Sequence, residues 1–421
     1  MEKTFIKGVS VPENCTKVVL DNGLKIFITE KKNFNTNYVI FGTKYGSIDT
    51  AFSKNGGEKV KVPEGIAHYL EHKLFESEDG DAFSRFSATG ANANAFTSFD
   101  RTCYLFSCAD RFYENLDILL DFVQNPYFTE QTVQKEQGII GQEIRMYDDN
   151  VGWCVLFSML GAMYKNHPVK IDIAGTVESI AKINAPLLYS CYETFYNPSN
   201  MFICVAGNVD TNKVIERIKN GIKPSTSVTI ERDTFSEPDE IVIPYVEKKM
   251  EIAKPVFCFG YKEKCDGERS LKDSLCSEIL LDVISGDTSP LFEELINKNL
   301  VNYEFDSEYF QGNGYATPIW QGESDNPKDV ADAIKAEVER LKKDGIDDEL
   351  FESARRSLYG TAIKRYNGVE GIVMGLVDCA MFDNGPYDDI KILKDLKKAD
   401  VEERLKLLDP QKTVLSVVYP K

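Results

Sequence analysis

The two halves of the chain close in the same way, and this repetition constrains the fold more than any other feature. Each half of the 421 residues starts with strand-like patterns, continues with helical ones, and ends with a helix and an apolar strand. The last strand of the first half is MFICVAGNV, residues 201–209, and VEERLKLLDPQKTVLSVVY, residues 401–419, closes the second half. The chain is also too long for one ordinary core. The sequence therefore predicts a duplicated α+β unit.

The boundary between the halves is expected in a polar stretch rich in Pro, Ser and Thr, NGIKPSTSVTIERDTFSEPDE. Such a composition is typical of a connecting segment. We predict an α+β domain over residues 1–215, a linker over 216–240, and a second α+β domain over 241–421. Each domain is expected to hold an antiparallel-rich sheet packed with helices. All three histidines of the chain fall in the first half, so only that half can carry a histidine metal site.

Composition narrows the classes of partner. Hydrophobic residues make up 43% of the chain and charged residues 28%, which is typical of a soluble globular protein. We expect no membrane association, because no run approaches the roughly 20 apolar residues that span a bilayer, and the N-terminus has no signal-like run. The net charge of -18 disfavours nucleic acid. Ten cysteines, several in apolar runs such as FICVAG, indicate buried thiols in a reducing compartment. We therefore expect a cytoplasmic protein.

The stretch HYLEH places two of the three histidines four residues apart, with a glutamate between them. On a helix His68 and His72 lie on one face, one turn apart, and Glu71 shares that face. Both imidazoles can then reach one metal ion. A catalytic zinc usually takes three protein ligands and a water whose pKa falls to about 7. A carboxylate is the natural third ligand, although histidines that merely line an ordinary helix remain an alternative.

A second helical stretch, KEQGIIGQEIRMYDDN, supplies carboxylates with a matching periodicity. Glu136 and Glu143 are seven residues apart and occupy one helical face. Ile140 stands between them on that face, which suits a buried surface better than a solvated one. Two solvated glutamates on an exposed helix are the alternative.

Together these motifs resemble those of the pitrilysin/insulinase family of zinc metallopeptidases, whose signature H-x-x-E-H is followed by a helix with E-x6-E. The resemblance implies that His68, His72 and Glu143 hold one Zn²⁺ per chain. It also implies that Glu136 orients the ligands and that Glu71 is the general base. The chain is most similar to half-length bacterial members, which are built from two α+β domains.

Two further segments resemble family motifs. GANANAFTSFDRTCY, residues 90–104, is similar to an edge strand to which substrate adds as an extra strand, which implies substrate binding by Asn94, Ala95 and Phe96. A small-residue turn before a core strand is the alternative. The segment YKNHPVKIDIAGT is also similar, and we expect His167 within it to be structural.

One family feature is missing. Family members supply an arginine and, seven residues later, a tyrosine that hold substrate and stabilise the oxyanion. In PLFEELINKNLVNYEFDSEY, Tyr303 fits the tyrosine, but Ile296 stands at the arginine position. We therefore expect a homologous partner chain to bring the Arg/Tyr pair in a heterodimer, and a homodimer to be weakly active at best. A register shifted by a few residues, or substitution by Arg355 or Arg356, remains open.

The resemblance implies a zinc-dependent endopeptidase subunit that cleaves peptides or unstructured segments inside a chamber formed with its partner chain. A non-catalytic assembly subunit of the same fold is the rival hypothesis. Family members that became scaffolds commonly lose part of the motif, whereas both histidines and both glutamates are present here. The sequence therefore favours the enzyme.

Overall fold

The chain forms two compact units, each assembled from three separate stretches of sequence. The computed structural model describes residues 1–78 and 80–421. Unit 1 contains Met1–Ile144, Asp172–Asp233 and Ile363–Asp388. Unit 2 contains Arg145–Ile171, Thr234–Ala362 and Asp389–Lys421. The predicted class, two α+β units with mainly antiparallel sheets, is confirmed, whereas domain boundaries at residues 215 and 240 stay a prediction.

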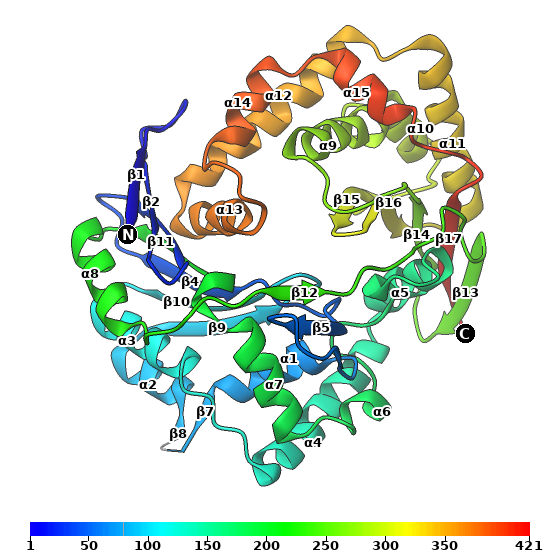
Figure 1. Cartoon of the computed structure of the whole chain (residues 1–421). Coiled ribbons are helices and arrows are strands. Elements are labelled where there is room, and N and C mark those ends of the chain that lie inside the picture. The colour runs from blue at the N-terminus through cyan, green and yellow to red at the C-terminus, as the bar shows by residue number, and fades with distance from the viewer. Residues whose placement is uncertain (79) are drawn as a thin grey trace. The chain divides into compact units, whose positions relative to one another are not determined.

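Unit 1 is built on a seven-stranded sheet in the order β1-β2-β3-β11-β4-β10-β9 (Figure 1). Its strands are β1 (Glu2–Ile6), β2 (Cys15–Val19), β3 (Lys25–Glu30), β4 (Asn37–Thr43), β9 (Asn92–Thr97), β10 (Thr102–Cys108) and β11 (Met201–Gly207). Only the β3–β11 pair is parallel. The sequence Asp-Asn-Gly, residues 21–23, favours a tight turn and lies between the antiparallel strands β2 and β3. Strands β1 and β9 form the two edges, and β9 pairs with β10 alone.

Helices cover both faces of this sheet. Ile203 and Val205 of β11 belong to a core beneath α1 (Ile66–Leu74) and α3 (Phe112–Val123). The intervening Cys204 is fully buried towards Cys379 of α13 (Val369–Phe382), because successive strand residues point to opposite faces. Figure 1 shows α13 on one face and α1 with α3 on the other. A helix from the last fifth of the sequence thus completes unit 1.

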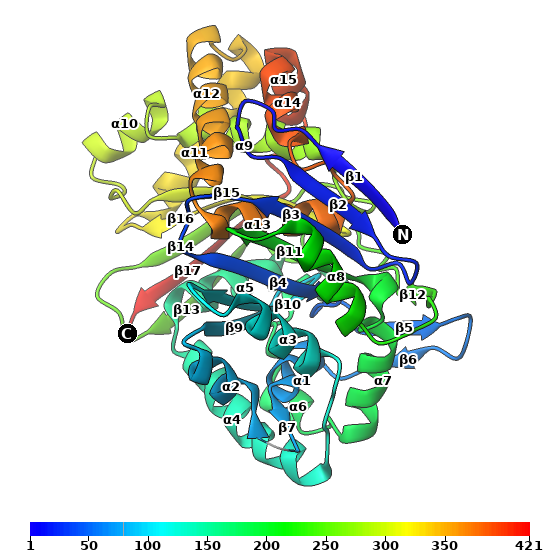
Figure 2. The same ribbon diagram turned by 90° about the vertical axis from the view of Figure 1, so that its left-hand side faces the viewer.

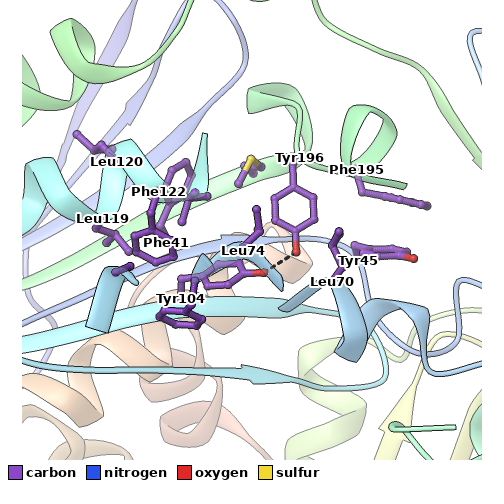
Figure 3. Close-up of a cluster of buried hydrophobic side chains, with 14 of the residues drawn as sticks. Phe41, Tyr45, Leu70, Leu74, Tyr104, Leu119, Leu120, Phe122, Phe195 and Tyr196 are labelled. Carbon is purple, nitrogen blue, oxygen red and sulfur yellow. Dashed lines mark hydrogen bonds between the residues drawn. The ribbon is translucent and has the colours of Figure 1, made fainter. Parts of the chain in front are cut away.

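An aromatic core fixes α1 against the sheet (Figure 3). The hydroxyls of Tyr104 and Tyr196 share a hydrogen bond of 2.8 Å, and Tyr45 stacks on Phe195 with ring centroids 4.0 Å apart. Leu70 of α1 is fully buried in the same cluster. Buried aromatic rings contribute large apolar areas, and a buried tyrosine hydroxyl needs a partner. This core holds the helix that carries HYLEH.

Further elements surround this framework. They are β5 (Ala51–Lys54), β6 (Val60–Lys61), β7 (Glu76–Ser77), β8 (Gly80–Asp81), β12 (Ile230–Arg232), α2 (Ala82–Thr89), α4 (Glu130–Asp148), α6 (Val177–Ile180), α7 (Ala185–Phe195) and α8 (Thr211–Gly221). Figure 2 gives a second view of these elements. The helix α4 begins directly after Thr129, whose Oγ1 accepts a hydrogen bond from the backbone N–H of Thr132 at 3.2 Å, as expected for its N-terminus.

The stretch predicted as a linker is folded in part. Residues 216–221 complete α8, and β12 pairs with β5. Arg232 donates from Nε to Oδ1 of the buried Asp49 at 2.8 Å within unit 1. Glu237 accepts three consecutive backbone N–H groups, those of residues 165–167, and the ammonium of Lys262 within unit 2. Arg232 and Glu237, both in the predicted linker or at its end, are therefore bound within the folded units.

Unit 2 has a five-stranded sheet in the order β13-β17-β14-β16-β15. Its elements are β13 (Tyr245–Met250), β14 (Val256–Tyr261), β15 (Asp306–Gly312), β16 (Tyr315–Glu323), β17 (Thr413–Pro420), α5 (Val151–Met163), α9 (Leu271–Ser285), α10 (Pro290–Asn297), α11 (Pro327–Asp344), α12 (Asp348–Lys364), α14 (Asp388–Asp395) and α15 (Lys398–Leu405). Cys258 of β14 contacts Met159 of α5. The next residue, Phe259, packs on Trp320, and the indole N–H of Trp320 donates a hydrogen bond to Ser285 of α9. A helix from the first half thus covers one face of this sheet.

The remaining general expectations concern thiols and membranes. All ten cysteines are free, and eight are buried, which agrees with the expectation of buried thiols. None of the helices in residues 1–78 and 80–421 combines the length and the apolar character that crossing a bilayer requires.

Candidate metal centre

Helix α1 begins later than the sequence indicated. Proline favours the first turn of a helix, so Pro63 predicts a start there, but the first helical residue is Ile66 and the N-cap is Gly65. Gly65 has φ +85°, and a Cβ there would lie 2.3 Å from the carbonyl oxygen of Ala174. Only glycine fits this left-handed turn at such close approach. The turn sets where the following helix points.

The helix orients both histidines of HYLEH to one side. The rings of His68 and His72 lie 4.6 Å apart, as their separation of four residues requires. Tyr69, between the two histidines in sequence, is fully buried and donates its hydroxyl to the carbonyl of Val133 in α4. Ile140 of α4 is also fully buried, so the face that it shares with Glu136 and Glu143 is turned inward, as its sequence position suggested.

The side chains of His68, His72 and Glu143 converge. One ligand atom from each lies within 4.8 Å of the others. Nε2 of His68 is 3.6 Å from Oε1 of Glu143, and Nε2 of His72 is 3.4 Å from Oε2. These separations exceed the usual N–H···O hydrogen bond of about 2.7–3.2 Å. They are close to the ligand–ligand edge of about 3.3 Å around a tetrahedral zinc with bonds of about 2.0–2.1 Å. Two imidazoles and one carboxylate are a donor set that fits a catalytic zinc.

Glu136 supports one of these ligands. Its Oε1 lies 3.1 Å from Nδ1 of His72. A proton on Nδ1 satisfies this contact and leaves the lone pair of Nε2 directed at the side where Glu143 lies, which is the arrangement that metal ligands need. Burial lowers the pKa of His72, but the hydrogen bond to Glu136 and the nearby carboxylates raise it above its ordinary value. Nδ1 of His68 is buried and has no hydrogen-bond partner within the described part of the chain.

Glu71 lies beside the cluster and is only 8% exposed. Its Oε2 accepts a hydrogen bond of 2.7 Å from Oγ1 of Thr97 in β9. Burial raises the pKa of this carboxyl, while the adjacent His68 opposes the rise. A carboxylate so placed can accept a proton next to the metal ligands without being one of them.

The predicted substrate-binding residues lie in two different units. Asn94, Ala95 and Phe96 are in the edge strand β9. Ala95 packs on the core beneath α1, so the flanking Asn94 and Phe96 point to the opposite face. Tyr303 belongs to unit 2 and is 83% exposed.

Two arginines left open as substitutes, Arg355 and Arg356, also belong to unit 2. Arg355 donates to the carbonyl of Leu393 at 2.7 Å and to Oε2 of Glu352 at 2.8 Å. Arg356 is exposed and lies 3.6 Å from the same carboxylate. The guanidinium of Arg355 is therefore hydrogen-bonded inside its own unit.

His167 is not among the described residues that converge in the metal cluster. It lies in unit 2 and is 1% exposed. Its Nε2 donates to the carbonyl of Asn313 at 2.9 Å, and its Nδ1 accepts from the N–H of Val169 at 3.1 Å. Both nitrogens of the neutral ring are thus used within the fold.

Known proteins share these motifs and this fold. Two family models match in succession, Insulinase (Peptidase family M16) over residues 59–177 and Peptidase M16 inactive domain over residues 182–358. Over 390 residues the chain is 43% identical to the uncharacterized zinc protease YmfH of Bacillus subtilis, covering 91% of each protein. The chain belongs to peptidase family M16. The resemblance inferred from HYLEH and KEQGIIGQE is confirmed.

Solved M16 structures agree in architecture. An M16-like peptidase from Alicyclobacillus acidocaldarius superposes with a TM-score of 0.94 at 33% identity, covering 98% of this chain and 100% of that one. Pitrilysin superposes with a TM-score of 0.77 over 100% of this chain but 46% of its own length. At 17% identity that match shows the shared fold alone. This chain thus matches a little under half of the length of pitrilysin.

Proposed function

We propose that this M16 chain is a zinc-dependent endopeptidase subunit in which His68, His72 and Glu143 hold one Zn²⁺. The observation that supports this most is the convergence of both Nε2 atoms on the two oxygens of Glu143, at 3.6 and 3.4 Å. The relatives named zinc protease support the same cofactor. Glu136 would fix the His72 ring through Nδ1 and so keep its Nε2 free for the ion.

The residues divide the chemistry of peptide hydrolysis between them. When bound, zinc would polarise the scissile carbonyl and lower the pKa of a water to about 7. Glu71 would accept a proton from the attacking water while the oxygen of that water bonds to the carbonyl carbon. It would then deliver that proton to the nitrogen of the leaving amine as the C–N bond breaks. Its position beside the cluster and its low exposure suit this role.

The substrate is expected to be an extended peptide or unstructured segment. The outer edge of β9 offers backbone groups that a substrate strand could pair with. Asn94 and Phe96 would contact it from one face of the sheet and Ala95 from the other. Such pairing needs a substrate backbone whose own N–H and C=O groups are unpaired, which favours flexible chains.

A partner chain completes the proposal. Because Ile296 stands at the arginine position and Arg355 is bound within unit 2, we propose that a homologous chain supplies the missing Arg/Tyr pair in a heterodimer. Tyr303 of this chain is retained as a candidate substrate contact. The two chains together would enclose the chamber in the cytoplasm.

The experiment that tests the proposal measures hydrolysis and zinc content in each variant, and so distinguishes the general base from the metal ligands. We expect Glu71→Gln to abolish hydrolysis of random-sequence, internally quenched peptides while zinc content stays near one ion per chain. His72→Ala should lose both activity and zinc. Glu64→Gln, which alters a carboxylate just before α1, serves as the control and should change neither. Loss of zinc in Glu71→Gln would show that the roles are misassigned.

A further inference from the structure

One hydrogen bond joins the edge strand β9 to the carboxylate of Glu71. Oγ1 of Thr97 lies 2.7 Å from Oε2 of Glu71. Thr97 is the last residue of β9 and shares the α1 side of the sheet with Ala95, two residues earlier. Neither the motif HYLEH nor the metal cluster accounts for this contact.

The direction of the bond follows from the neighbouring hydroxyls. Thr97 stands directly opposite Thr102 of β10, and their Oγ1 atoms are 3.5 Å apart. The hydroxyl of Thr102 donates to the carbonyl of Tyr45 at 2.9 Å, so its proton is already used. An ionised carboxylate can only accept. Thr97 therefore donates its single proton to Glu71, in a charge-assisted bond.

The bond holds one oxygen of Glu71 and not the other. The carboxylate sits at the end of a flexible side chain, so its orientation depends on what anchors it. Among the described residues, hydrogen bonding of Glu71 involves Oε2 alone. Anchoring Oε2 to the sheet restricts the orientation of the carboxylate and leaves Oε1 for proton transfer.

We infer that Thr97 is a positioning residue, which holds the carboxylate of Glu71 in the orientation needed to take a proton from water and return it to the leaving amine. This inference rests on the proposed peptidase function. Thr97 directly follows Asn94, Ala95 and Phe96, so the strand proposed to pair with substrate also anchors the base. Pairing in register along β9 would then set the scissile bond at a fixed distance from Glu71.

The test compares three variants of matched chemistry. Thr97→Val removes the hydroxyl and keeps the side-chain volume, and Thr97→Ser keeps the hydroxyl. Thr43→Val is the control, because Thr43 lies opposite Thr102 on β4 and its hydroxyl bonds the carbonyl of Phe195 at 2.7 Å, away from Glu71. All three changes affect threonines in one row across the sheet.

The first readout needs no activity. In crystal structures of the metal-free chain, we expect the Glu71 carboxylate of Thr97→Val to move by about 1 Å or more, or to adopt several orientations, a displacement large enough to slow catalysis. It should keep the wild-type position in Thr97→Ser and Thr43→Val. An unchanged, single orientation of Glu71 in Thr97→Val would overturn the inference.

The second readout is kinetic, with quenched peptides and the active assembly. We expect Thr97→Val to lower kcat by about 10- to 100-fold, as misplaced catalytic groups do, with KM and zinc content near wild type. Thr97→Ser should restore most of kcat, and Thr43→Val should retain it. Wild-type kcat in Thr97→Val, with Glu71→Gln inactive, would refute the inference and leave the proposed function standing. Full activity in Glu71→Gln would instead refute the proposed function.

Discussion

Oε1 of Glu136 lies 3.1 Å from Nδ1 of His72, so a carboxylate on α4 fixes the ring of a histidine on α1. Removing that negative charge while keeping the shape weakens the hold on the ring and the basicity of Nε2. We therefore expect Glu136→Gln to lower zinc affinity by about 10- to 100-fold, measured by competition with a chromogenic chelator. Glu130→Gln, at the exposed start of the same helix, should leave affinity unchanged. Equal affinity in the two variants would show that Glu136 does not support the ligand.

A second prediction concerns the helices that the two units take from distant sequence. Val373, Leu376 and Val377 of α13 are buried in unit 1, and burying each such side chain contributes about 1.5–3 kcal/mol. A fragment of residues 1–240 lacks them. We expect this fragment alone to show no cooperative urea unfolding by circular dichroism, and co-expression with residues 241–421 to restore it. Cooperative unfolding of the isolated fragment would instead support independent domains divided at residues 216–240.

The helices that each unit takes from distant sequence also show what sequence patterns cannot predict. The pair His68 and His72, and the inward face around Ile140, depend on spacing within one helix, so periodicity was enough to find them. Which sheet a helix covers depends on long-range packing. For that reason the packing of α5 in unit 2 and of α13 in unit 1 could not be predicted from the sequence.

The polar contacts of the predicted linker could not be predicted from the sequence for a related reason. Arg232 and Glu237 looked like parts of a solvated linker because their partners, Asp49 and the backbone of residues 165–167, are remote in sequence. Thr97 carries a local signal, since it ends the strand that begins at Asn92. However, only the fold shows that its hydroxyl meets Glu71.

A third prediction follows from the protonation of His167. Burial lowers the pKa of this imidazole to about 4, against about 6.5 in an unfolded chain. The unfolded state therefore binds more protons between these values, and stability is lost as the pH falls from about 6.5 towards 4. We expect this group to cost about 1.5 kcal/mol between pH 6.5 and 5. Urea unfolding of wild type and His167→Asn should reveal a shallower pH slope in the variant. Identical slopes would contradict a buried neutral imidazole.

A fourth prediction concerns the missing arginine. With Ile296 at that position, we expect the purified chain alone to cleave quenched peptides weakly or not at all. Mixing it with a homologous chain that carries the Arg/Tyr pair should produce activity, which should disappear when the partner's arginine is replaced by alanine. Full activity of the lone chain would contradict the heterodimer. Loss of that activity in Arg356→Ala, but not in Lys364→Ala, would then identify Arg356 as the substitute.

The measurement that tests the zinc site most directly is anomalous diffraction at the zinc absorption edge from crystals grown with zinc. We expect a single strong peak in unit 1, within bonding distance of Nε2 of His68, Nε2 of His72 and the carboxylate of Glu143, and no such peak in His72→Ala crystals. A peak bound by other residues, or no peak in the wild-type protein, would contradict the assignment of His68, His72 and Glu143 as the zinc ligands.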